Sequence, residues 1–235
     1  MIVSVHIANV GARSTLARLA RPPKLGSVPG LRQVEVGITA PLSGSLRKSP
    51  DFGRVGVIGF WNDEAALDAF LTQDPRAAGL AEGFSARLAP LRAHGSWPGL
   101  DAEVPKTRTV VHDGPVVVLT LGRFRVSQAP RFFRASAKAE AAVAGAEGLI
   151  WATGLARPPF IATCSLWESA DAACAYAYAT DDDPHPNAIR AGNVKPFHKR
   201  EAFIRFHPIA VSGALSGKNP LSAEAVARVQ SREDR

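Results

Sequence analysis

A repeat within the sequence restricts the folds open to this chain more than any other feature. Residues 54–70, RVGVIGFWNDEAALDAF, align with residues 160–176, FIATCSLWESADAACAY, at an offset of 106 positions, 167 minus 61. Each segment is a short apolar run followed by an alanine-rich stretch behind polar residues, a pattern typical of a strand that leads into a capped helix. The alignment pairs Phe60 with Leu166, Trp61 with Trp167, and Phe70 with Tyr176. The sequence therefore predicts an internal duplication.

The apolar periodicity predicts the same order of elements in both halves: strand, helix, strand, strand, helix, strand. In the first half we expect the first four elements at residues 2–8, 14–19, 32–39 and 54–60, with a linker or flap at 40–52. The second helix should follow residues 61–64 and end at 71, and the last strand should span 88–97. In the second half we expect them at residues 116–124, 129–146 with Ser127 as cap, 149–155, 160–167, a helix capped by Ser169 that ends at 178, and 202–206 after an irregular basic segment. The strand at 32–39 alternates apolar and polar residues, which predicts a half-buried strand.

This order is the ferredoxin-like, or split β-α-β, arrangement. Its sheet carries both helices on one face, so the other face must be buried or used. Two such sheets in one chain are able to face each other, and the fold class predicted is α+β, with two tandem ferredoxin-like repeats forming a pseudo-dimeric α+β barrel around a ligand cavity. The predicted boundaries are 1–105 for the first repeat, 106–210 for the second repeat with the active site, and 211–235 for a polar tail.

Composition narrows the classes of partner. The chain is 46% hydrophobic and 21% charged, with a formal net charge of +7. A positive net charge permits three classes of partner: nucleic acid, an anionic lipid surface or an acidic ligand. Its Lys and Arg residues are dispersed, without stacking aromatics or a zinc-finger motif, so we expect no nucleic acid, whereas peripheral membrane contact and a solvated basic face both stay open. Two cysteines and no signal peptide or spanning run predict a cytoplasmic protein, with membrane association as an option.

Histidines gather in the second half. His185, His198 and His207 fall within 23 positions, whereas the corresponding region of the first half has His94 alone. A histidine Nε2 is a good axial ligand for haem iron, and an aromatic-lined sheet face is a good wall for the porphyrin. We favour His185 for the metal over His198, because it follows the helix that should border the cavity. A plainer interpretation makes His185 part of a turn and His198 a residue of a basic loop.

Other residues near these histidines suit a cofactor. Four cations are able to pair with carboxylates such as haem propionates, although a solvated basic loop has the same composition: they are Arg190, Lys195, Lys199 and Arg200. Large aromatic residues are also concentrated here, as cofactor contacts or as core: they are Trp151, Trp167, Tyr176 and Tyr178. The sequence has no serine elbow, P-loop, metalloprotease helix, paired CxxC or dinucleotide-binding motif, which argues against those enzyme classes.

Three segments together resemble the spheroidene monooxygenase family, carotenoid-modifying oxygenases. They are GLIWATGLARPPFIATCSLWES at 148–169, the His-Pro-x-Ala-Ile stretch at 185–189, and KPFHKREAFIRFHP at 195–208. The resemblance extends to about Pro208 and is specific in the second half. The family's pattern of aromatic and histidine positions is matched by Trp151, Trp167, Tyr178, His185, Phe197 and His198.

The resemblance implies a haem-dependent monooxygenase that inserts oxygen into an acyclic carotenoid held between the two sheets, and that uses an external electron donor such as a ferredoxin. On this view Trp151, Trp167 and Tyr178 are catalytic, His185 binds the metal, and His198, Arg190, Lys195 and Arg200 complete the cofactor site. A homo-oligomer is a further option. The alternatives are a cofactor-free monooxygenase on the same barrel, and a carrier of haem or of a lipophilic molecule without turnover.

Overall fold

The structure is a computed structural model that describes residues 1–42, 50–107, 111–143, 145–177 and 197–215. The elements of the first half are β1 (Ile2–Asn9), α1 (Ala12–Ala20), β2 (Leu31–Pro41), β3 (Asp51–Trp61), α2 (Glu64–Gln73), the short 3-10 helix Pro75–Ala77 and β4 (Phe84–Gly95). Those of the second half are β5 (Val116–Phe124), the 3-10 helix Val126–Gln128, α3 (Ala129–Val143), β6 (Leu149–Arg157), β7 (Phe160–Trp167), α4 (Ala170–Ala177) and β8 (His198–Ser212).

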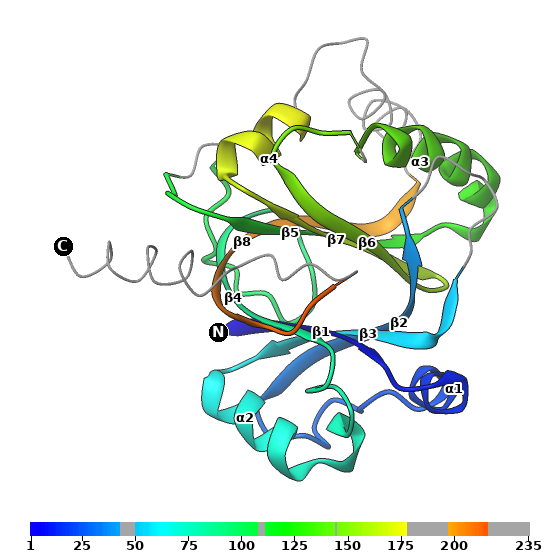
Figure 1. The fold of residues 1–235 in the computed structure, drawn as a ribbon, viewed down its shortest axis with the longest axis vertical. Coiled ribbons are helices and arrows are strands. Elements are labelled where there is room, and N and C mark those ends of the chain that lie inside the picture. The colour runs from blue at the N-terminus through cyan, green and yellow to red at the C-terminus, as the bar shows by residue number, and fades with distance from the viewer. Residues whose placement is uncertain (43–49, 108–110, 144, 178–196, 216–235) are drawn as a thin grey trace.

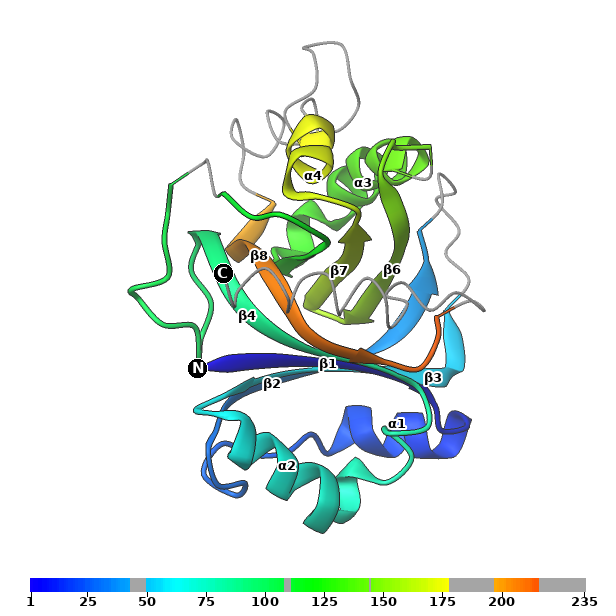
Figure 2. The same cartoon turned by 60° about the vertical axis from the view of Figure 1, so that its left-hand side comes forward.

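The eight strands close into one antiparallel barrel, in the order β1-β3-β2-β6-β7-β5-β8-β4. The two halves join where β2 pairs with β6 and where β4 pairs with β8. Helices α1 and α2 lie outside the barrel on one side, and α3 and α4 lie outside it on the other (Figures 1 and 2). The predicted α+β barrel is therefore confirmed, whereas descent of the halves from one repeat and the boundaries at 105 and 210 stay predictions.

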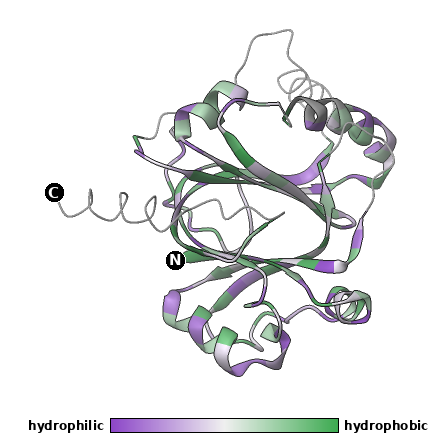
Figure 3. Ribbon diagram, in the orientation of Figure 1, coloured by the Kyte–Doolittle hydropathy of each residue, from purple (hydrophilic) through white to green (hydrophobic). Residues whose placement is uncertain are grey.

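The side chains of the barrel separate into an inner core and two outer cores. Alternation along each strand sends every second side chain inward. The inner core contains Val5, Ile58, Leu119, Leu121, Ile204 and Phe206 from both halves. The outer cores contain Val36, Val57, Trp61 and Phe70 beneath the first pair of helices, and Val116, Trp167 and Ala173 beneath the second. The strands accordingly carry hydrophobic residues on much of their length (Figure 3), and the expectation that residues 32–39 are half-buried is wrong, because the barrel covers the polar side of β2 as well.

The last strand is longer than predicted. β8 begins at His198 rather than at Ala202, so the basic segment before Ala202 is part of the sheet. Its backbone pairs with β5 on one side and β4 on the other, which satisfies its peptide groups along most of its length. β3 likewise begins at Asp51, inside the predicted flap.

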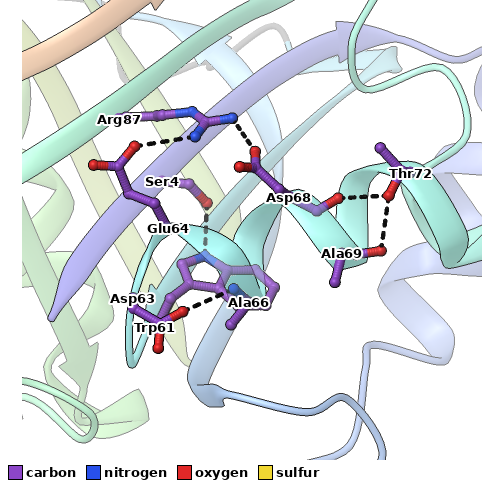
Figure 4. Close-up of polar contacts among 9 residues, drawn as sticks. All are labelled: Ser4, Trp61, Asp63, Glu64, Ala66, Asp68, Ala69, Thr72 and Arg87. Carbon is purple, nitrogen blue, oxygen red and sulfur yellow. Dashed lines mark hydrogen bonds and ion pairs between the residues drawn. The ribbon is translucent and has the colours of Figure 1, made fainter.

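Of the two predicted helix caps in the second half, one is confirmed and one is wrong. Ser169 caps α4, because its hydroxyl accepts a hydrogen bond from the Ala172 amide at 3.0 Å. Ser127 instead lies inside the 3-10 turn that precedes α3. In the first half, Asp63 caps α2 by accepting from the Ala66 amide at 2.8 Å (Figure 4). The predicted end of the α4 helix at 178 lies outside the described residues.

Exposed ion pairs fasten α2 to the neighbouring strand β4. Arg87 pairs with Glu64 at 3.2 Å and with Asp68 (Figure 4). Exposed pairs of this kind contribute little to stability, so α2 is held mainly by its buried Leu67 and Phe70. In the part of the chain described here, no helix has the length and apolarity that spanning a membrane requires.

Candidate functional site

The predicted site residues do not gather around one point. Tyr178, His185, Arg190 and Lys195 lie outside the described residues. The other four are Trp151, Trp167, His198 and Arg200. The structure places these on both faces of the second half's sheet, so they do not all border one space.

Trp151 lies inside the barrel. It extends from β6 into the inner core, where its ring meets Phe84 of the first half edge to face, with centroids 5.0 Å apart. Its indole Nε1 is buried and has no hydrogen-bond partner among the described residues. Trp151 thus presents a free N–H donor in the barrel interior, as a residue that contacts a bound molecule would.

Trp167 lies on the opposite face, beneath α4. Its ring packs against Tyr176 with centroids 5.2 Å apart, and its Nε1 donates to the Ser165 hydroxyl at 2.9 Å. The indole is therefore engaged by its neighbours, in the outer core of the second half. The structure does not bring Trp167 and Trp151 together.

His198 lies on the helix-covered face as well, at the start of β8. Its ring is 5.2 Å from that of Phe132 on α3, and it rests over Gly122 of β5. Leu121 beside Gly122 points into the barrel, so Gly122 and the imidazole above it face outward. His198 consequently does not line the space between the two sheets, which is where the sequence led us to place the cofactor.

The hydrogen bonding of His198 is one-sided. Its Nδ1 is 2.8 Å from Oε2 of Glu201, whereas its Nε2 is buried without a partner among the described residues. The hydrogen bond from His198 lowers the pKa of the Glu201 carboxyl, and burial opposes it in part. A carboxylate at Nδ1 fixes the tautomer that carries its proton there, so the lone pair of the ring is on Nε2, the atom that lies close to Gly122.

Aromatic side chains surround this imidazole. The Phe132 ring lies 6.3 Å from Phe124 and 5.8 Å from Phe197. The Arg131 guanidinium lies over the Phe197 ring, 4.6 Å from its centroid. Arg200 is exposed, but it lies opposite Arg123 in the sheet, and this register places it on the inner face, away from the imidazole. We call His198, Glu201 and these three phenylalanines the imidazole pocket: it offers one nitrogen ligand, an apolar wall and the nearby Arg131. Within the described ranges, no three His, Cys, Asp or Glu side chains form a metal cluster.

A charged cluster inside the barrel was not predicted. Glu35 of β2 is paired with Arg123 of β5, with 2.7 Å between Oε1 and the guanidinium nitrogen. The Gln33 amide also donates to Oε1, at 2.8 Å. The guanidinium of Arg123 lies 5.6 Å from the centroid of the Trp97 ring, which in turn lies 6.0 Å from that of Phe160. Residues of both halves thus form this group, which we call the Glu35 cluster.

Burial raises the pKa of Glu35, while Arg123, Gln33 and Arg157 oppose that rise. The Glu35 side chain is 0% exposed. In the sequence, Gln33 and Glu35 alternate with Val34 and Val36, a pattern that predicts a strand with one polar, exposed face. No local pattern identifies Gln33 and Glu35 as interior residues, because only closure of the barrel buries the face of β2 that carries them.

No family model matches the sequence. The chain is 32% identical over 202 residues to a spheroidene monooxygenase of Rubrivivax gelatinosus, covering 83% of this chain and 75% of the relative. It is 30% identical over 151 residues to a spheroidene monooxygenase of Rhodobacter capsulatus, covering 63% of this chain and 62% of that protein. Among solved structures, an aldoxime dehydratase in complex with butyraldoxime has a TM-score of 0.50 at 9% identity, covering 88% of this chain and 79% of that one, a likeness of fold alone.

Proposed function

Because this chain belongs to the spheroidene monooxygenase family, we propose that it is a haem-dependent oxygenase that inserts oxygen into an apolar, carotenoid-like substrate. The names of both relatives support an oxygenase. The two tandem ferredoxin-like halves of the proposed pseudo-dimeric barrel then have different tasks, with the cofactor held by the second.

The observation that carries the haem proposal is the buried Nε2 of His198. This atom has no partner in the described part of the chain, while the Nδ1 of the same ring is held by Glu201 at 2.8 Å. Histidines that bind metals commonly donate their other ring N–H to a carboxylate, which orients the ring and raises its basicity. On this ground we assign the iron to His198, in preference to His185.

The residues of the imidazole pocket have separate tasks in this proposal. Haem iron with a histidine ligand supplies the activation of dioxygen, with electrons from an external donor. Glu201 holds the imidazole and keeps the Nδ1 proton in place. Phe124, Phe132 and Phe197 exclude water from the Nε2 side. Arg131 is suited to a carboxylate of a haem.

The position of His198 changes where the substrate is expected. β5 and β8 separate the imidazole pocket from the barrel interior, so a substrate between the two sheets would not reach iron bound by His198. We therefore propose that the oxidised end of the hydrocarbon approaches from the side of α3. Burial of apolar surface, at about 25 cal/mol per Å², is enough to hold a long hydrocarbon there.

The test is Soret-region absorption of the full chain expressed with a supply of haem. We expect a Soret band in the wild type and in His185→Ala, and its loss in His198→Ala. His112→Ala, a histidine that contacts His207 at the far end of β8 from His198, serves as the matched control. Circular dichroism shows whether each variant is folded.

The other outcomes are equally definite. Loss of the band in His185→Ala alone moves the iron to His185. If the wild type takes up no haem, the iron mechanism fails, and a cofactor-free oxygenase takes its place. Oxygen consumption that depends on both reductant and an acyclic carotenoid distinguishes an oxygenase from a carrier, which binds haem without turnover.

A further inference from the structure

The Glu35 cluster lies on the opposite face of the second sheet from the imidazole pocket, and the proposed iron chemistry does not use it. Its ion pair joins the two halves of the chain across the barrel, from β2 to β5. Arg123 pairs along its own sheet with Phe160, a residue of the inner core. A carboxylate and a guanidinium are thus set against an otherwise apolar interior.

Two atoms of this cluster lack the hydrogen bond that their chemistry calls for. Oε2 of Glu35 is buried, and no described residue donates to it. Nε1 of Trp97 is buried too, with no acceptor in the described ranges. Buried polar atoms are nearly always paired in proteins, and an unpaired one is costly. The Arg123 guanidinium thus lies next to two residues that each have one unpaired atom, the acceptor Oε2 of Glu35 and the donor Nε1 of Trp97.

Access to the cluster comes from the side of Arg123. The Arg123 side chain is 34% exposed, while that of Glu35 is 0% exposed. Trp97 is 4% exposed and packs on Phe160. The cluster therefore extends from solvent into the apolar interior, as at the mouth of a barrel, a common place for small-molecule sites.

We propose that the Glu35 cluster binds the hydroxyl group of an otherwise apolar molecule. A hydroxyl donates one hydrogen bond and accepts others, so it is able to donate to Oε2 of Glu35 and to accept from Nε1 of Trp97. A carbonyl or ether oxygen accepts only, and leaves Oε2 unpaired. Glu35 and Arg123 are already paired with each other, which favours an uncharged group at the two unpaired atoms. The apolar remainder of the molecule contacts the inner core.

This site does not depend on the iron site. An alcohol bound at the cluster would not reach iron held by His198, because β5 and β8 lie between them, so the cluster is a binding site apart from the proposed oxidation. Its test is a binding measurement without haem or oxygen, and it therefore fails or succeeds separately from the proposed oxygenase activity.

The experiment is calorimetric titration of the purified full chain with n-octanol and with heptyl methyl ether. The two probes have equal numbers of heavy atoms, but only the alcohol donates a hydrogen bond. We expect the wild type to bind the alcohol about tenfold more tightly, the ratio that one added hydrogen bond supports. Equal affinities, or no binding of the alcohol, would overturn the proposal.

Two variants test the roles of the named atoms. Glu35→Gln keeps an oxygen for Arg123 and places an amide N–H where Oε2 was, so the preference for the alcohol should disappear. Trp97→Phe removes the donor and should weaken both probes. Glu64→Gln, the same change at an exposed carboxylate of α2, is the control and should keep the wild-type ratio. If Glu35→Gln does not fold, the proposal is tested by Trp97→Phe. Unchanged affinities of that variant for both probes would overturn the proposal and leave the cluster only a structural role, as an ion pair that joins the two halves.

Discussion

The indole N–H of Trp61 donates to the hydroxyl of Ser4 at 2.9 Å, in the outer core of the first half. Trp167, which aligns with Trp61, donates to Ser165 at the same distance. The ring that follows each tryptophan on the next helix also packs at the same separation, 5.2 Å for Phe70 and 5.2 Å for Tyr176. The serines differ in position, since Ser4 lies on β1 and Ser165 on β7. Both halves thus anchor an indole under a helix, with the acceptor taken from a different strand.

Ser4→Ala and Ser165→Ala should each lower the free energy of unfolding by about 1–3 kcal/mol, because each leaves a buried indole N–H unpaired. Urea unfolding measures the loss. Ser27→Ala, at an exposed loop residue, is the control and should change stability by less than about 0.5 kcal/mol. A neutral effect of both core changes would mean that the two indoles find other acceptors.

Gly122→Ala should displace His198. A Cβ on Gly122 would lie 2.7 Å from Cδ2 and 2.8 Å from Nε2 of the imidazole. Overpacking of this kind costs about 1–3 kcal/mol, which thermal unfolding detects. If iron is bound by His198, the Soret band should shift or disappear as well. In Gly154→Ala on β6, the nearest atom is 3.3 Å away, so that variant should lose less stability and keep the band.

His6 should make the protein less stable in mild acid. Burial, with a smaller effect of Arg87, lowers its pKa from 6.5 to about 4, and neither ring nitrogen has a partner among the described residues. The unfolded chain therefore takes up a proton below pH 6.5 that the folded chain accepts only near pH 4. The free energy of unfolding should fall as the pH drops through this window, by about 3 kcal/mol in total.

The measurement for His6 is urea unfolding at several pH values between 7 and 4. His6→Leu should remove its share of the slope, whereas the exposed control His94→Leu should keep the wild-type slope. The same slope in His6→Leu as in the wild type would show that the acid sensitivity comes from other groups.

Arg123→Ala should destabilise the barrel by about 3 kcal/mol at neutral pH, the lower end of the range for a broken buried ion pair, because Arg123 is itself partly exposed. It leaves the Glu35 carboxylate without its cation, and this raises the pKa of Glu35 further. Protonation of Glu35 relieves the cost, so the difference from the wild type should shrink as the pH falls toward 5. Chemical unfolding at both pH values measures it. A loss that does not depend on pH would mean that the lost contact with Trp97, and not the charge, is responsible.

Local patterns predicted the secondary structure well. The strand at 116–124 and the strand at 160–167 have the predicted bounds, because their apolar runs end at turn residues. β8 was predicted to begin too late, because its first residues are polar and exposed, and only pairing with β5 makes them part of a strand.

The sequence by itself determined the order of the elements, the pairing of like positions in the two halves and the family. Alternation along a strand decides which residues share a face, as with Gln33 and Glu35. It does not decide what covers that face. The pairings of β2 with β6 and of β4 with β8 do so, and these contacts between residues far apart in the chain leave no local pattern. Only the tertiary structure therefore placed Glu35 inside the barrel and His198 outside it, beneath α3.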